Sequence, residues 1–296
     1  MRSFRSLLFV PGHKPAWIEK AVAAGVDAVV MDLEDSVPHD AKQKAREAVA
    51  ASIDHLAAHR PHTGVVVRPN ALETDDFGAD LEAVVRPGLE ALLVPKIYSA
   101  NDIYRFDGLL THLELRAGMQ RGSIELIPSL ETAASVALAD TLAACPRVSS
   151  LQSATARDGD IAREVGFVWS AGGIETLYLR SKAVLASRSN GLSHPLCGVW
   201  QDIADIEGLR AFAEQNRALG FRGQLVLHPS HVGEVNRIFS VTPEEVSRAR
   251  RMVECYESAL RAGSASVMFE GEHVDTAHIK TSRALIELAQ KQELNA

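Results

Sequence analysis

Carboxylate side chains lie at or after the ends of three apolar segments of this sequence, and basic side chains at or after the ends of two others. The acids are Asp32, Glu34, Asp35, Glu131, Asp158 and Asp160. The bases are Arg68 and Lys96. If the apolar segments are parallel strands, these side chains meet at the carboxyl ends of the strands. Carboxylates at one place repel one another unless a cation neutralises them. Oxygen ligands without paired His or Cys favour Mg²⁺ or Mn²⁺ over zinc.

A small set of these residues is enough for metal-assisted chemistry. Mg²⁺ typically takes one or two protein carboxylates, so Glu131 with either Asp158 or Asp160 would suffice. Arg68 can hold the carboxylate of a small substrate through two parallel hydrogen bonds. A 2-keto acid can chelate the same ion through its keto and carboxylate oxygens. The predicted reaction is an aldol-type carbon–carbon cleavage, in which the cation stabilises an enolate.

Other interpretations of the same residues stay open. Asp32, Glu34 and Asp35 could only cap and hydrogen-bond the rim of the fold, and Arg68 could be a structural ion pair. Lys96 could form a Schiff base, which would make the chain a metal-free aldolase. The surrounding carboxylates disfavour that reading, because they raise a lysine pKa that must be lowered for this role.

Eight apolar segments, most of them followed by a helix-forming stretch, are placed to carry these side chains. We predict strands at Ser6–Val10, Ala28–Asp32, Val65–Arg68, Ala91–Pro95, Ile124–Pro128, Val148–Gln152, Ser193–Val199 and Gln224–Leu227. Continuous apolar strands separated by helices indicate a parallel sheet that is covered on both faces. Eight such units in about 240 residues favour an α/β fold of the (β/α)₈ (TIM) barrel type. An open, doubly wound sheet is the alternative.

The last part of the chain has a different pattern. We predict a long helix over Pro243–Gly263 after a Thr242 cap, a hairpin over Val267–Val274, and a helix over Thr276–Lys291. We therefore expect a catalytic domain over residues 1–240 and an extension over 241–296. The extension could act as a lid over its own barrel mouth or a neighbour's.

Composition and charge limit the possible partners and location. The hydrophobic fraction of 46% and charged fraction of 23% are those of an ordinary globular protein. A net charge of −7 argues against a nucleic-acid surface. The apolar stretch Leu7–Val10 ends at Pro11, too early for a signal peptide or a membrane span. The cysteines at 145, 197 and 255 are widely spaced, which favours a reducing cytoplasm.

Nine segments carry a family resemblance, in the same order along nearly the whole chain. They are Arg5–Gly12, Asp27–Val37, Val67–Asn70, Val94–Lys96, Leu130–Ala133, Asp160–Gly166, Arg180–Lys182, Gly220–Gly223 and His228–His231. Together they resemble the citrate lyase β-subunit-like group of the HpcH/HpaI aldolase superfamily. That group includes malyl-CoA and citramalyl-CoA lyases. The resemblance implies a TIM barrel that assembles as a homotrimer or hexamer.

The resemblance also implies roles for the residues at the strand ends. It places Mg²⁺ on Glu131 and Asp160, with Glu131 also beside the substrate. It places the substrate carboxylate on Arg68. Glu34 and Asp35 match positions that orient metal-bound water.

Coenzyme A and lid residues follow from the same resemblance. Phe9, Lys14 and Lys20 match coenzyme A contacts, and the two lysines form a local basic cluster that the net charge conceals. The segment Gly271–Asp275 resembles a lid motif of the group. In that motif an aspartate, supplied across a subunit interface, exchanges the proton at the thioester α-carbon. Asp275 is therefore the candidate general acid/base.

The implied activity is a Mg²⁺-dependent lyase for a small acyl-CoA such as malyl-CoA or citramalyl-CoA, with acetyl-CoA and a 2-keto acid as the other side. Three alternatives use the same residues. One is a thioesterase or malate-synthase-like enzyme, in which water attacks the thioester. Another is a citrate lyase β subunit that acts on an acyl-carrier-protein thioester. The last is a metal-binding barrel without catalysis.

Overall fold

The computed structural model describes residues 2–293. They form two compact units, one over Ser3–Phe239 and a second that begins at Ser240. None of the helices between residues 2 and 293 is both long enough and apolar enough to cross a membrane.

The first unit is a closed barrel of eight parallel strands. The strands are β1 Ser6–Pro11, β2 Ala28–Asp32, β3 Gly64–Arg68, β4 Ala91–Val94, β5 Glu125–Leu130, β6 Gln152–Ser153, β7 Leu196–Cys197 and β8 Gly223–Val226. β8 pairs with β1, which closes the barrel and leaves no free edge. The predicted TIM barrel is confirmed, and the open doubly wound sheet is wrong.

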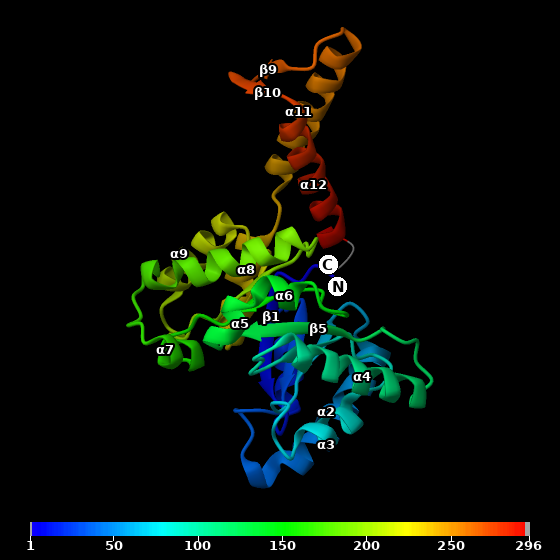
Figure 1. Ribbon diagram of the computed structural model, residues 1–296. Helices are drawn as coiled ribbons and strands as arrows, with labels where there is room; N and C mark the ends of the chain where they lie inside the picture. Colours follow the sequence, from blue (N-terminus) through cyan, green and yellow to red (C-terminus); the bar gives the residue numbers. More distant parts are fainter. Residues whose placement is uncertain (1, 294–296) are drawn as a thin grey trace. The chain divides into compact units, whose positions relative to one another are not determined.

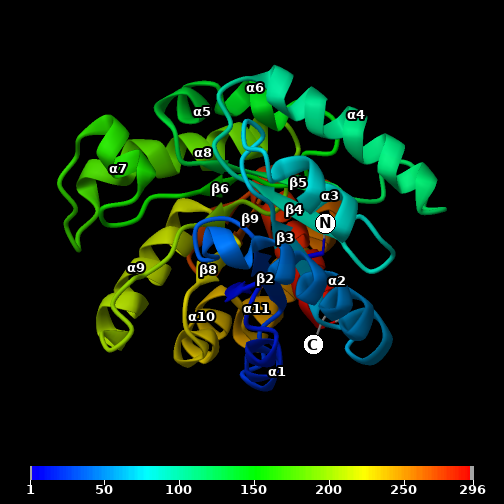
Figure 2. The same cartoon turned by 90° about the horizontal axis from the view of Figure 1, so that it is seen from below.

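Helices surround the strands, as Figure 2 shows. They are α1 Ala16–Ala23, α2 Lys42–His59, α3 Phe77–Val84, α4 Ala100–Arg116, α5 Ala133–Ala137, α6 Ala139–Ala143, α7 Asp160–Val165, α8 Leu177–Ser189, α9 Ile206–Leu219 and α10 Val232–Phe239. Short 3₁₀ turns lie at His39–Ala41, Ile174–Thr176 and Pro229–His231.

Most strand boundaries differ from the predictions by one or two residues, and larger differences occur at three places. The segment between β5 and β6 contains two short helices, α5 and α6, where one continuous helix would be typical, because the backbone at Leu138 turns out of the helical region. β6 and β7 have two residues each, and Val148 makes only an isolated bridge to Leu126. α7 begins at Asp160, in a stretch where no helix was predicted.

Alternation along the strands separates two layers of core. On β2, Ala28 and Val30 point into the barrel, whereas Val29 and Met31 pack against the surrounding helices. The interior cluster is small, and the layer between strands and helices contains most of the buried apolar side chains. This packing explains why the strands are apolar without interruption, since both of their faces are buried.

His194 is buried just before β7, and burial lowers its pKa to about 4. Its Nε2 lies 2.7 Å from the Phe4 carbonyl oxygen, and its Nδ1 lies 3.2 Å from Ser3 Oγ. As pH falls, His194 therefore takes up a proton near pH 6.5 in the unfolded chain, but only near pH 4 in the folded protein. We expect the free energy of unfolding to fall as pH drops from about 6.5 to 4, by up to about 3 kcal/mol.

Urea titrations between pH 4 and 7 measure this effect. His194→Gln should flatten the pH dependence in that window, because glutamine has no charge to gain. His112→Gln, at an exposed position of α4, should leave the slope as in the parent protein. Parallel slopes for the parent and His194→Gln would contradict the assignment.

The second unit contains two helices and a hairpin. These are α11 Pro243–Arg261, β9 Val267–Phe269, β10 Glu272–Val274 and α12 Thr276–Glu293. Figure 1 shows α11 and α12 side by side. Thr242 caps α11 by accepting from the Glu245 amide, as predicted. Glu270 and Gly271 both have positive φ, which is the backbone of a two-residue hairpin turn. The predicted elements are confirmed here.

Candidate active site

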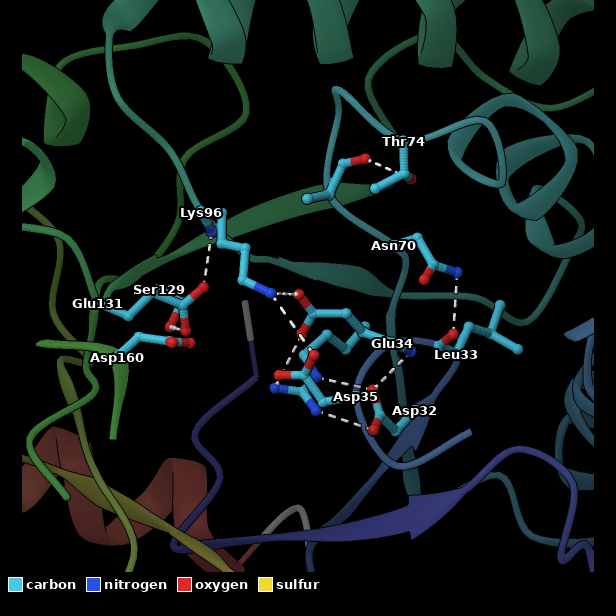
Figure 3. Close-up of polar contacts among 12 residues, drawn as sticks. Asp32, Leu33, Glu34, Asp35, Asn70, Thr74, Lys96, Ser129, Glu131 and Asp160 are labelled. Carbon is cyan, nitrogen blue, oxygen red and sulfur yellow. Dashed lines mark hydrogen bonds and ion pairs between the residues drawn. The ribbon is translucent and has the colours of Figure 1, made fainter. Parts of the chain in front are cut away.

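The polar residues predicted at the strand ends come together at the carboxyl ends of β2 to β6 (Figure 3). Glu34 and Asp35 follow β2, and Arg68 is the last residue of β3. Lys96 and Glu131 follow β4 and β5. In a parallel barrel all the carboxyl ends of the strands lie on one rim, so one polar residue at the end of each strand is enough to build a common site.

Arg68 is held by two acids. Its Nε and Nη2 donate to Oδ1 and Oδ2 of Asp32 at 2.7 and 2.8 Å, and its Nη1 lies 3.2 Å from Glu34 Oε2. Its guanidinium also stacks over the Phe9 ring, 5.0 Å from the centroid. The bidentate contact that was predicted for a substrate carboxylate is therefore made by Asp32, as in the ion-pair interpretation. The Nη1 side faces Glu34.

The Arg68–Asp32 pair keeps both partners charged. Burial would raise the pKa of Asp32, but the hydrogen bonds and the charge of Arg68 outweigh burial, and the pKa is lowered. Burial likewise opposes the charge on Arg68, and the Asp32 hydrogen bonds raise the arginine pKa above its usual value. The pair is a fixed positive–negative unit beneath the site.

Lys96 links two of the acidic residues. Its amide donates to Glu131 Oε1 at 2.6 Å, and its Nζ donates to Glu34 Oε1 at 2.7 Å and lies 3.5 Å from Asp35 Oδ1. Its φ of +50° is unusual for a residue with a side chain. Burial lowers the pKa of Lys96, but the hydrogen bond and the charge of Glu34 raise it by more, so the pKa is above its usual value. A protonated amine is a poor Schiff-base nucleophile, so the structure disfavours the metal-free aldolase.

Glu34 is the acid whose protonation is most altered. Burial raises its pKa to about 7, and the neighbouring charges of Glu131 and Asp35 add to this, while Arg68 and Lys96 oppose it. In the described part of the chain its Oε2 accepts no hydrogen bond, although it lies near Arg68. A carboxyl group with this pKa can take up or release a proton close to neutral pH.

Glu131 is held in place from its own strand. Its Oε2 lies 3.0 Å from Ser129 Oγ, and that hydroxyl, which has one proton to donate, also lies 2.7 Å from Gln152 Oε1. Burial and the charge of Asp160 raise the pKa of Glu131. Asp160 lies beside Glu131 in Figure 3 and also pairs with Arg163. The carboxylates of Glu131 and Asp160 thus lie close together at the barrel rim (Figure 3).

These donors fit a hard divalent cation. Among residues 2–293 no group of three or more His, Cys, Asp or Glu side chains is arranged around one metal position. Mg²⁺ does not need one, because it commonly takes one or two carboxylates and completes its shell with water and substrate. Glu131 and Asp160 supply such a pair, whereas Asp158 is exposed and has a φ of +54°.

The residues predicted for coenzyme A lie on β1 and the segment after it. Phe9 lies under Arg68 and is partly buried. Lys14 and Lys20 are exposed, and Lys14 Nζ lies 4.3 Å from the centroid of the Trp17 ring. Phe9 therefore borders the acidic cluster, and both lysine side chains are exposed to an anion from solvent.

Asp275 belongs to the second unit. Its Oδ1 accepts from the Ala277 amide at 2.9 Å and lies 2.8 Å from His278 Nδ1. The hydrogen bond with His278 lowers the pKa of Asp275. The contact with Ala277 is that of a residue that caps a helix, here α12. The carboxylate is half exposed, so it remains accessible for the acid/base role that the resemblance implies.

A comparison with protein families identifies the family of this chain. The model of the HpcH/HpaI aldolase/citrate lyase family matches residues 5–229, a range that includes every strand of the barrel. The chain belongs to this family. The predicted family assignment is thereby confirmed, and residues 5–229 contain all predicted site residues except Asp275.

Curated relatives in this family act on acyl-CoA thioesters. The chain is 34% identical to a (3S)-malyl-CoA thioesterase of Cereibacter sphaeroides, over 97% of this chain and 95% of the relative. It is 30% identical to an L-malyl-CoA/beta-methylmalyl-CoA lyase of the same species, over 98% and 95%. The alignments therefore cover nearly the whole length of each protein, including most of the part after residue 240.

A solved structure shows what a similar member of the family binds. The chain matches CitE from Mycobacterium tuberculosis, in complex with magnesium, acetoacetate and coenzyme A, at 26% identity and a TM-score of 0.72. The match covers 98% of each chain. Members of this HpcH/HpaI family thus bind Mg²⁺ and coenzyme A.

Some residues of the site were not recognised from sequence. Ser129 contacts Glu131, and Gln152 contacts Ser129, its partner in the register of β5 and β6. A signal was available for Ser129, because it is two residues before Glu131 and side chains alternate along a strand. Gln152 is a polar residue in a buried strand, which is itself unusual. Lys96 was considered only as a nucleophile and serves here as an ion-pair partner.

Proposed function

We propose that this chain is a Mg²⁺-dependent carbon–carbon lyase for a small hydroxy-dicarboxyl acyl-CoA thioester such as malyl-CoA or citramalyl-CoA. The products, or the substrates of the reverse condensation, are acetyl-CoA and a 2-keto acid. The observation that carries the proposal is the adjacency of Glu131 and Asp160 at the rim that also holds Arg68, Lys96 and Glu34. The lyase and CitE relatives support the choice of substrates.

Glu131 and Asp160 are the residues that would hold Mg²⁺, and Mn²⁺ could replace it. When bound, the ion supplies Lewis-acid stabilisation of negative charge on substrate oxygens. Ser129 and the Lys96 amide orient the Glu131 carboxylate, so that it is ready before the substrate arrives. Asp35 completes the acidic rim.

Proton movements fall to the chain's own carboxylates. Cleavage removes the proton of the substrate hydroxyl and breaks the carbon–carbon bond, and the electron pair passes to the thioester α-carbon. Glu34, with Asp35 beside it, is suited to accept the hydroxyl proton because its pKa is about 7. The α-carbon then takes up a proton, and Asp275 is the candidate for that exchange. Because its pKa is lowered in the structure, it can donate only after it has itself taken up a proton.

Binding of the two substrate parts uses different residues. Arg68 would attract the keto-acid carboxylate through its Nη1 side, and Asp32 fixes the guanidinium plane for that contact. Phe9, Lys14 and Lys20 would contact coenzyme A, the lysines through its phosphates. We propose that the unit from Ser240 on is a lid, and that the chain is a cytoplasmic homotrimer or hexamer.

A panel of coenzyme A thioesters tests the function. We expect malyl-CoA or citramalyl-CoA to yield a keto acid, detected as its phenylhydrazone, only when Mg²⁺ is present. Chelation by EDTA should abolish the product, and added Mg²⁺ should restore it. No keto acid from any thioester, with the protein folded and Mg²⁺ in excess, would exclude the lyase.

Thioester hydrolysis is the second candidate. Its support is the 34% identity to a (3S)-malyl-CoA thioesterase. Thiol titration in the same panel separates the two reactions, since hydrolysis releases free coenzyme A without a keto acid. Malate-synthase-like activity would show as coenzyme A release from acetyl-CoA and a keto acid. A citrate lyase β subunit would require an acyl-carrier-protein thioester.

A further inference from the structure

An amine from outside the barrel holds the backbone of the acidic loop that follows β2. Lys42, the first residue of α2, donates from Nζ to the carbonyl oxygens of Leu33 and Glu34 at 2.6 and 2.7 Å. Its third contact is Asn70 Oδ1 at 2.7 Å. An ammonium group has three N–H bonds, so each of them has an acceptor.

The second holder of this loop is Asn70, which follows β3. Its Nδ2 donates to the same Leu33 carbonyl at 2.9 Å, as Figure 3 shows. Asp80, fully buried on α3, accepts from both the amide and the Nδ2 of Asn70 at 2.8 and 2.6 Å. Arg46 Nη1 lies 3.1 Å from Asp80. Lys42 is therefore one end of a connected polar network that runs from α2 to α3.

The amide side of the same loop is held from the barrel. Asp32 accepts from the Glu34 amide at 3.0 Å and from the Ser36 amide at 3.1 Å. The carbonyls of Leu33 and Glu34 point the other way, to Lys42. With both sides of the peptide units bonded, the Glu34 side chain can leave the backbone in one direction only. That direction leads to Lys96 and Arg68.

We propose that Lys42 is a positioning residue of the active site, which acts by fixing the backbone that carries Glu34 and Asp35. Lys42 does not face the reacting groups itself, since two of its donors are used on the loop and the third on Asn70. The inference rests on the proposed function only for its effect on turnover. Its effect on the loop is independent of the reaction.

Lys42→Met tests the proposal, because methionine keeps the length of the side chain and loses all three donors. We expect hydrogen exchange at the Glu34 and Ser36 amides to quicken at least about tenfold. We expect kcat to fall about tenfold to a hundredfold at little change in thioester KM, because the acid is misplaced after binding. Lys42→Arg should recover part of both effects.

Two variants of the same helix serve as controls. Lys44→Met removes an exposed amine two residues away and should match the parent in every measurement. Ile53→Val removes one buried methylene from α2 and controls for lost stability. If Ile53→Val quickened loop exchange as much as Lys42→Met at equal urea midpoints, the loop would merely follow global stability and the proposal would fail.

The remaining outcomes separate this inference from the proposed function. Unchanged exchange and unchanged kcat in Lys42→Met would overturn the inference while the lyase stands. If the parent protein cleaves no thioester and exchange is still faster in Lys42→Met, the positioning of the loop is upheld and only the proposed reaction is excluded. Faster exchange with unchanged kcat would show that the loop is held but that turnover does not need it, and would overturn the positioning role.

Discussion

Glu131→Gln is expected to lower kcat/KM about a thousandfold, which corresponds to about 4 kcal/mol of transition-state stabilisation. Glutamine keeps the shape of the side chain and the contacts with Ser129 Oγ and the Lys96 amide can be partly retained. The negative charge that would hold Mg²⁺ is lost. We therefore also expect the Mg²⁺ dissociation constant, measured by calorimetry, to rise by at least about tenfold.

Controls for this variant come from other acids. Glu82→Gln changes an exposed glutamate of α3 and should leave both activity and Mg²⁺ affinity as they are. Asp160→Asn should resemble Glu131→Gln, whereas Asp158→Asn should resemble Glu82→Gln. The reverse order for the two aspartates would move the second ligand to Asp158. Full activity of Glu131→Gln would remove the metal from the mechanism.

Arg68→Gln is expected to lower the free energy of unfolding by about 3–5 kcal/mol, because it leaves Asp32 buried without its partner. The pKa of Asp32 is lowered in the folded protein. The stability from this pair is therefore complete above the unfolded carboxyl pKa of about 3.9 and is lost as pH falls below it. Urea unfolding at pH 7 measures the loss.

Matched variants separate the buried charge from other causes. Arg86→Gln removes a partly exposed arginine that lies 2.8 Å from Asp54, and should cost less than about 1 kcal/mol. Asp32→Asn combined with Arg68→Gln should regain part of the stability, since no unpaired charge remains. It should not regain turnover if Arg68 meets the substrate. Equal losses for Arg68→Gln and Arg86→Gln would contradict the burial argument.

The barrel could be predicted because its signals are local and repeated. Apolar strands such as Ala28–Asp32 and the helices between them recur along the chain, and parallel strands need covered faces. The boundaries were weaker where the repeat is weak. β6 and β7 are short, and α7 follows a segment without a clear helical period.

The sequence by itself determined which acids and bases lie at the rim, because each follows a strand and parallel strands end together. It could not decide what each one contacts. Arg68 could bind a substrate or an acid, and only the tertiary structure placed Asp32 against it, across 36 residues of chain. Lys96, Ser129 and Lys42 gained their partners in the same way. Such contacts depend on side-chain directions across different strands and helices, and no local pattern of residues encodes those directions.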